Sequence, residues 1–475
     1  MLAGYLAVSI RFIKKNAAVS LVKILSLTLG LACSILVVAH VQYVMSYDKH
    51  FENWQSIYRV VTSLTSTERL NLPLTADPYG HELREEYPDV DKVAKMRPDE
   101  AVFSIDDQSA SNSFHWVDEE FLDIFSLEFL SGDRSSVLSQ VNSVIISENT
   151  ATKYFGGKNP LNRTLTMNGS RELRVTGIFQ DLPANSHLEL DILISSTTGR
   201  SMNTPSFMSG SHWLSFQTYT YVTLRDGASF EQINDSLPSF VERNIPEQLS
   251  AAARQISLAI SLEPLTSIYL SSRESSSSGD ASRLKLLVAL VIFSSLVFIG
   301  SCVNYLNLAV SQMPKRVKEV GVRRTLGASQ TQIMTEYTAE SALLTIMALM
   351  LSFVLAFLLF PAYAALANID ISISDLPIFE LLISIAVLVI FTIILSGLLP
   401  AFFLSRIQVA SVFSQGTNGS LNSTMRLKSV FTFFQVTLAI SLVLLAIFMY
   451  RLVDHLERAD PGFNPNNLVL IDSAT

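Results

Sequence analysis

The chain has 475 residues, of which 49% are hydrophobic and only 16% are charged, and its mean hydropathy is +0.35. Soluble domains carry about 25% charged residues, so the composition excludes an ordinary soluble globular protein and indicates membrane-spanning segments. The formal net charge is −8, and the two cysteines, Cys33 and Cys302, both lie in apolar runs. A disulfide framework is therefore not expected.

Five apolar runs in the sequence are long enough to cross a membrane as helices. About 20 residues suffice, because the hydrocarbon core is about 30 Å thick and the helix rises about 1.5 Å per residue. The first run is longer than the apolar core of a signal peptide and lacks a small-residue cleavage site, so it is expected to remain as an anchor. The predicted transmembrane helices are residues 24–47, 284–312, 337–366, 381–404 and 429–451.

Basic residues alternate between the segments that connect these helices. Residues 1–23, 313–336 and 405–428 are rich in Lys and Arg, whereas the link between the third and fourth helices has three acidic residues and no basic one. By the positive-inside rule, the N-terminus and the other two basic segments are cytoplasmic, and the C-terminus is extracytoplasmic.

The long segment between the first two helices, residues 48–283, is expected to form a mixed α and β domain outside the membrane. Residues 46–280 hold 18 Lys and Arg against 32 Asp and Glu, which argues against nucleic acid as a partner. The patterns at 57–64 and 219–227 predict strands, and "SSRESSSSGDAS" at 271–282 predicts a polar hinge. Helices are expected after Ser147 and within "SFEQINDSLPSFVERNIP", with a hairpin turn at Asn168-Gly169.

The same segment has no recognisable catalytic or metal-binding pattern. Its histidines are scattered, and neither HExxH, CxxC nor GxSxG occurs. "YFGGKNP" lacks the preceding Gly and the Ser or Thr after Lys158 that a phosphate-binding loop needs. A membrane-anchored enzyme is therefore disfavoured, and no catalytic residue, metal ligand or cofactor site is predicted on this chain.

The arrangement as a whole resembles a MacB-like/FtsX-like ABC transporter permease. "SYDKHFENWQSIYRVVT", "HWVDEEFLDIFSLEFLSGD" and "TGIFQDLPANSHLELDILIS" resemble the MacB-like periplasmic core domain. "CVNYLNLAVSQMPKRVKEVGVRRTLGASQTQIMTEYTAESALL" and "LLPAFFLSR" resemble the FtsX-like permease domain. The fold implied is an integral membrane α-helical protein of about five helices, with a large mixed α+β extracytoplasmic domain between helices 1 and 2.

The basic segment, residues 314–332, is the most positively charged short stretch of the chain. By the resemblance, residues 313–336 form a coupling helix that docks on a cytoplasmic ATPase subunit. Gly327 can end this helix and Ser329 can cap the next one. The alternative is that its basic side chains only anchor the loop to anionic membrane lipid. The residues expected to carry the coupling are Arg316, Glu319, Gly321, Arg323, Arg324 and Gly327.

Four polar residues near or within the predicted spans are candidates for packing between helices. Asn304 and Asn307 share one face of the second span and could form hydrogen bonds to other helices, worth roughly 0.6–2 kcal/mol each. Glu336 and Glu340 lie at the cytoplasmic end of the third span. Their side chains either pair with the basic segment or face water.

No GxxxxGK[ST] motif occurs in the chain, so the resemblance implies that ATP binds to a separate ATPase subunit. Residues 452–475 resemble the start of a second extracytoplasmic segment, as in longer permeases with two repeats, so the chain is expected to end early in the second repeat. Further partners implied are a second permease copy or paired permease subunit, a periplasmic adaptor or outer-membrane channel, and membrane lipid.

The function implied by the resemblance is that of a permease subunit in the inner membrane. ATP hydrolysis on the partner would move the coupling helix, and the spans would transmit that motion to the periplasmic domain for export or extrusion of a substrate. The alternative is a transmembrane regulator that controls a periplasmic partner, such as a cell-wall hydrolase, without transporting cargo.

Overall fold

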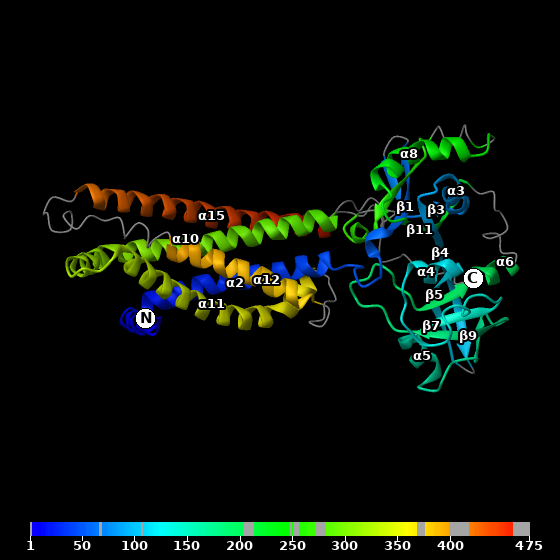
Figure 1. Ribbon diagram of the computed structural model, residues 1–475, viewed down its shortest axis with the longest axis horizontal. Helices are drawn as coiled ribbons and strands as arrows, with labels where there is room; N and C mark the ends of the chain where they lie inside the picture. Colours follow the sequence, from blue (N-terminus) through cyan, green and yellow to red (C-terminus); the bar gives the residue numbers. More distant parts are fainter. Residues whose placement is uncertain are drawn as a thin grey trace. The chain divides into compact units, whose positions relative to one another are not determined.

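A computed structural model describes residues 2–65, 69–105, 108–202, 213–247, 249, 256–271, 282–367, 376–398 and 418–458. The chain divides into two compact units. The helical unit comprises Met1–Gln42 and Leu286–Ser473, and the α/β unit comprises Tyr43–Lys285. Both are drawn in Figure 1.

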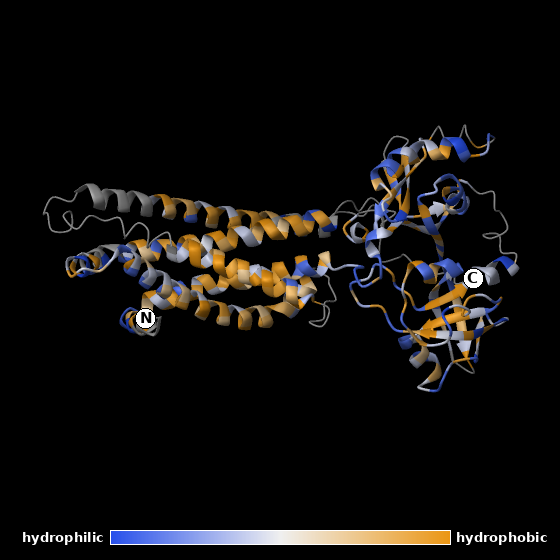
Figure 2. Ribbon diagram, viewed as in Figure 1, coloured by the Kyte–Doolittle hydropathy of each residue, from blue (hydrophilic) through white to orange (hydrophobic). Residues whose placement is uncertain are grey.

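The helical unit is built from long helices that are rich in hydrophobic residues (Figure 2). Five helices of the described residues are long and apolar enough to cross a membrane, with spans at Ala17–Met45, Arg283–Gln312, Gln330–Leu366, Ile378–Gly397 and Ser429–Phe448. The predicted fold class is confirmed by these five helices and by the mixed α/β domain between the first two. The helices are α1 (Leu2–Lys15), α2 (Ala17–Met45), α10 (Ser282–Thr325), α11 (Gln330–Ala367), α12 (Ile378–Ile393), a π-helical turn (Ile394–Leu398) and α15 (Asn418–Arg458).

The core of the helical unit lies where α2, α10 and α11 meet. Leu27 and Leu31 of α2 are fully buried against Cys302 of α10 and Leu344 of α11. The helices approach closely at Gly30, where an added Cβ would lie 2.5 Å from Oγ of Ser301. Small residues of this kind let membrane helices pack backbone against backbone.

The α/β unit is organised around one mixed sheet. Among the described residues its main path runs in the order β12-β1-β11-β4-β5-β10-β7-β9-β6. The strands are β1 (Ile57–Thr65), β2 (Arg69–Leu72), β3 (Thr75–Ala76), β4 (Val90–Ile105), β5 (Gln108–Val117), β6 (Phe129–Ser131), β7 (Ser143–Ser147), β8 (Thr164–Met167), β9 (Arg171–Phe179), β10 (Ile192–Ser195), β11 (Phe216–Leu224) and β12 (Ala259–Pro264). The helices are η1 (Trp54–Ser56), α3 (Pro78–Glu86), α4 (Glu119–Ile124), α5 (Glu148–Phe155), α6 (Ser196–Ser201), α8 (Phe230–Asn244) and η2 (Leu265–Ser267).

Strand β4 connects the two halves of this sheet. Its first residues pair with β11, and the rest pair with β5 and with the short strand β8. One apolar core packs α3 and α8 against β1 and β11, and a second fills the half made by β5, β7, β9 and β10. A third core, which includes Phe121, Phe125 and Tyr221, lies under α4.

Several local predictions are confirmed in this unit. Ser147 and Ser229 are N-caps, and their hydroxyls accept hydrogen bonds from the backbone of Thr150 and Gln232. Asn168 and Gly169 both have positive φ, at 50° and 65°, in the turn between β8 and β9. The strand predicted at 219–227 corresponds to β11, which begins earlier, at Phe216. It also ends earlier, at Leu224, because residues 225–227 form the turn that follows.

Some predicted features lie outside the described residues. They are most of the polar hinge at 271–282, the acidic link at 368–375, much of the 405–428 segment, and residues 459–475.

Candidate functional site

The basic segment is not a separate helix, although the sequence suggested one at 313–336. Helix α10 continues through the second span to Thr325 without a break, and α11 begins at Gln330. Gly327 has a φ of 95°, and the backbone N–H of Ala328 donates to the carbonyl of Arg323 at 3.0 Å, which closes the end of α10. Ser329 and Gln332 form a reciprocal capping box with distances of 3.0 and 3.3 Å.

Arg316 and Glu340 form a buried ion pair between α10 and α11. Nη1 and Nη2 of Arg316 donate to the two carboxylate oxygens of Glu340 at 3.0 and 2.7 Å. Both residues are 8% exposed. Burial alone would lower the pKa of Arg316, but the hydrogen bonds and charge of Glu340 outweigh it and raise that pKa. Arg316 was predicted to carry the coupling, yet its side chain is directed into the protein.

Arg323 forms ion pairs at the end of α10, on the more exposed side of that helix. It donates to Glu336 of α11 at 2.6 Å and to Glu319, one turn earlier on α10, also at 2.6 Å. The hydrogen bond that Arg323 donates to Glu336 is the main reason that the pKa of Arg323 is raised. Glu336 and Glu340 therefore pair with the basic segment. The sequence alone allowed either this pairing or exposure of the two carboxylates to water.

The turn between α10 and α11 presents apolar side chains to solvent. Leu326 is 82% exposed and Val322 is 52% exposed. Gly321 is buried in the helix and Arg324 is partly exposed, so only part of the predicted coupling set faces outward. We call residues 322–329 the tip. The sequence prediction relied on the charged residues of this segment and did not include Leu326. The available signal was a leucine that stands between an arginine pair and the glycine of a turn.

Asn304 and Asn307 connect three helices, as their positions on α10 suggested. Asn304 Nδ2 donates to Oγ of Ser26 on α2 at 2.8 Å, and Asn307 Nδ2 donates to Oε1 of Gln435 on α15 at 2.9 Å. Gln435 Nε2 donates back to Asn304 at 3.4 Å. Because an unpaired amide is costly in hydrocarbon, this arrangement fixes the axial register of α2, α10 and α15.

In the α/β unit, a buried group of polar side chains joins the residues after α2 to the sheet. Nδ1 of His187 lies 2.9 Å from Oδ1 of Asp48, and Nε2 lies 2.9 Å from the hydroxyl of Tyr221 on β11. The hydroxyl of Ser186 and the N–H of His187 also donate to Asp48. No sequence motif pointed to this group, because its members are far apart in the chain.

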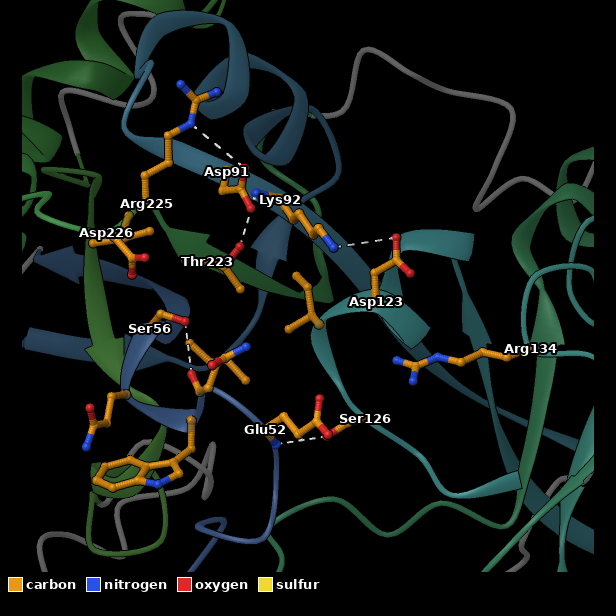
Figure 3. A pocket seen from close by; sticks show the side chains of 16 residues that line it. Glu52, Ser56, Asp91, Lys92, Asp123, Ser126, Arg134, Thr223, Arg225 and Asp226 are labelled. Carbon is orange, nitrogen blue, oxygen red and sulfur yellow. Dashed lines mark hydrogen bonds and ion pairs between the residues drawn. The ribbon is translucent and has the colours of Figure 1, made fainter. Parts of the chain in front are cut away.

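A cleft of the α/β unit has a volume of about 610 Å³ and lies at the ends of β1, β4 and β11. Figure 3 shows Lys92 directed toward Asp123 and Arg225 toward Asp91, with nitrogen–oxygen distances of 3.7 and 3.8 Å. These long, exposed ion pairs contribute little to stability. The charged residues that line the cleft are Glu52, Asp91, Lys92, Asp123, Arg134, Arg225 and Asp226.

The cleft has the character of a polar surface and not of an apolar ligand pocket. Trp54 is the one aromatic residue that lines the cleft. The Trp54 indole packs on the apolar core, and Nζ of Lys49 lies over its ring, 5.3 Å from the centroid. Among the described residues, no group of three or more His, Cys, Asp or Glu could hold a metal ion. The arrangement suits contact with a polar, mixed-charge partner.

Two family models match this chain. The MacB-like periplasmic core domain matches residues 20–240, and the FtsX-like permease C-terminal domain matches residues 291–409. The macrolide export ATP-binding/permease protein MacB of Vibrio parahaemolyticus is 25% identical over 283 residues, covering 58% of this chain and 39% of that protein. MacB of Aggregatibacter actinomycetemcomitans is 24% identical over 246 residues, covering 49% and 33%. The match thus spans well under half the length of these relatives.

Solved structures of related domains are also similar. A domain of a permease protein from Porphyromonas gingivalis is 25% identical and covers 45% of this chain and 91% of its own, with a TM-score of 0.39. The periplasmic region of MacB from Actinobacillus actinomycetemcomitans is 17% identical and covers 45% and 93%, with a TM-score of 0.30. On the two family models, which together cover most of the sequence, the chain belongs to the MacB-like/FtsX-like ABC transporter permease family.

Proposed function

We propose that this chain is the permease subunit of an ABC transporter of the mechanotransmission type. A separate cytoplasmic ATPase subunit binds the tip, and ATP hydrolysis on that subunit moves α10 and α11. The helices transmit the motion to the α/β unit, which acts on a periplasmic substrate for export or extrusion. ATP belongs to the partner, and no cofactor is proposed for this chain.

The observation that carries the proposal is the exposed tip at the end of α10, which ion pairs hold to α11. Leu326 and Val322, which are 82% and 52% exposed, together place apolar surface at the end of α10, and a protein partner can bury such a surface at the core of an interface. The bidentate Arg316–Glu340 pair and the Arg323–Glu336 pair hold the tip to α11. A force applied to the tip is therefore carried by two helices and not by a loose loop.

The length of α10 supports transmission over a long distance. Its 44 residues correspond to about 66 Å of continuous helix. The amide contacts from Asn304 and Asn307 tie α10 to α2 and α15, so axial movement of α10 involves its neighbours. The alternation of basic segments in the sequence supports a cytoplasmic tip in the inner membrane, with the N-terminus on the same side. A second permease copy or a paired permease subunit completes the proposed assembly.

Purification of the tagged chain from its native host in mild detergent tests this proposal. Leu326→Asp places a charge at the centre of the proposed contact and should abolish copurification of an ABC ATPase. Leu366→Asp is the matched control, because Leu366 lies at the other end of α11 and is 89% exposed. An ATPase that is absent from the wild-type sample, or retained equally by Leu326→Asp, would contradict the proposal.

The polar cleft favours a second candidate, in which the same motion regulates a periplasmic partner. Its mixed charges suit a protein surface better than an apolar drug. Copurification of a cell-wall hydrolase would support regulation, whereas an adaptor or outer-membrane channel would support transport.

A further inference from the structure

The N-terminal helix α1 contributes directly to the site that holds Arg316. Helix α1 packs against α11, and the ring of Phe12 lies over the guanidinium of Arg316, 4.1 Å from Cζ to the ring centroid. Tyr337 of α11 provides a second ring at 4.7 Å. The guanidinium is therefore bound by two aromatic rings and one carboxylate, from two different helices.

A small cavity lies between α1, α10 and α11 at this point. It has a volume of about 30 Å³ and is lined by Ser9, Phe12, Arg316, Tyr337 and Glu340, among others. Within the described part of the chain, Nε of Arg316 and Oγ of Ser9 are buried without a hydrogen-bond partner. The volume accommodates one water molecule, which can accept from Nε and donate to Ser9. Such a water would join α1 to α10 by hydrogen bonds as well as by packing.

We infer that α1 is a clamp that positions the basic segment by holding Arg316 against Glu340. Arg316 is then a positioning residue and makes no contact with the partner, which leaves docking to the exposed tip. The inference rests on the proposed function for its consequence, but the clamp itself is a property of this chain alone. Without α1, one face of the buried ion pair would open to water, and water weakens both the ion pair and the cation–π contact.

Two substitutions at Phe12 separate a cation–π clamp from simple packing. Phe12→Leu keeps an apolar side chain but removes the π face, whereas Phe12→Trp keeps a π face that binds cations at least as well. Ile10→Ala is the matched control on the same helix, because Ile10 is 46% exposed.

Hydrogen exchange of residues 316–329, measured on the full chain in lipid nanodiscs without any ATPase, tests the clamp. Phe12→Leu should accelerate exchange there by roughly three- to thirtyfold, while Phe12→Trp and Ile10→Ala should match the wild type. The inference is overturned if Phe12→Leu leaves exchange unchanged, if Phe12→Trp accelerates it equally, or if Ile10→Ala does. Because no ATPase is present in the exchange measurement, the two proposals can be contradicted separately. Exchange can contradict the clamp while the ATPase still copurifies, and copurification can fail while exchange supports the clamp.

Discussion

His187 lies 2.9 Å from Asp48 through Nδ1, and both side chains are buried. Asp48 has a φ of 60° and follows α2 by only three residues, while His187 reaches Tyr221 in the middle of the sheet. Within the α/β unit, this contact therefore helps to hold the residues that follow α2 against the sheet.

We expect Asp48→Ala to destabilise the α/β unit by about 2–4 kcal/mol. The substitution leaves the buried donors of Ser186 and His187 without an acceptor and places alanine at positive φ. Asp48→Asn should cost less, because asparagine keeps one acceptor oxygen and tolerates this conformation. All three tryptophans, Trp54, Trp116 and Trp213, lie in this unit, so denaturant titration of tryptophan fluorescence in the full chain measures it. Equal stability of the two variants would contradict the assigned role.

The membrane helices and the local elements of the α/β unit could be predicted because their signals are local. Apolar length identifies spans, and Ser147, Ser229 and Asn168-Gly169 act on their immediate neighbours. Asp48, His187 and Tyr221 could not be found in this way, since contacts between residues that are 139 and 34 positions apart leave no recognisable spacing in the sequence. Arg316 shows the same limit at the candidate site: the sequence shows its charge, but only the packing of α1 and α11 shows that it faces inward.

Glu340→Gln should destabilise the helical unit by about 3–5 kcal/mol, since it leaves the buried charge of Arg316 without its partner. Glu319→Gln should cost at most about 1 kcal/mol, because the Arg323–Glu319 pair is largely exposed. Both cysteines lie in this unit, and Cys302 is 2% exposed, so the rate of reaction with a fluorogenic maleimide on heating reports its unfolding. Similar transition midpoints for the two variants would show that burial of the first pair has no energetic consequence.

The close approach of α2 and α10 predicts a large effect of Gly30→Ala. The new methyl group would lie 2.5 Å from Oγ and 2.7 Å from Cβ of Ser301, so the helices must separate at a cost of about 1–3 kcal/mol. Gly300→Ala is the control, because its Cβ meets only the end of the Leu438 side chain, at 3.2 Å. The thiol assay should show a loss for Gly30→Ala that Ser301→Gly restores. A double variant as unstable as Gly30→Ala alone would disprove the steric explanation.

His115 predicts a dependence of stability on pH. Burial lowers its pKa from 6.5 to about 4, opposed in part by the charge of Asp191. The unfolded chain binds a proton at this histidine below pH 6.5, whereas the folded chain does so only near pH 4. The contribution is therefore complete above pH 6.5 and is lost as the pH falls toward 4, by up to about 3 kcal/mol.

Tryptophan fluorescence titrations at pH 7 and pH 4.5 check this expectation. His115→Gln cannot bind the proton, so the difference in unfolding free energy between the two pH values should be smaller than in the wild type. An unchanged difference would assign the acid sensitivity to other groups.

The coupling of the tip to the α/β unit is tested most directly by hydrogen exchange of residues 43–51 in nanodiscs that contain the chain and its ATPase, with and without ATP. ATP should change exchange of these residues in the wild type and in Leu366→Asp, but not in Leu326→Asp. If ATP is hydrolysed by a bound ATPase and the exchange of residues 43–51 does not change in the wild type, motion is not transmitted from the tip to the α/β unit.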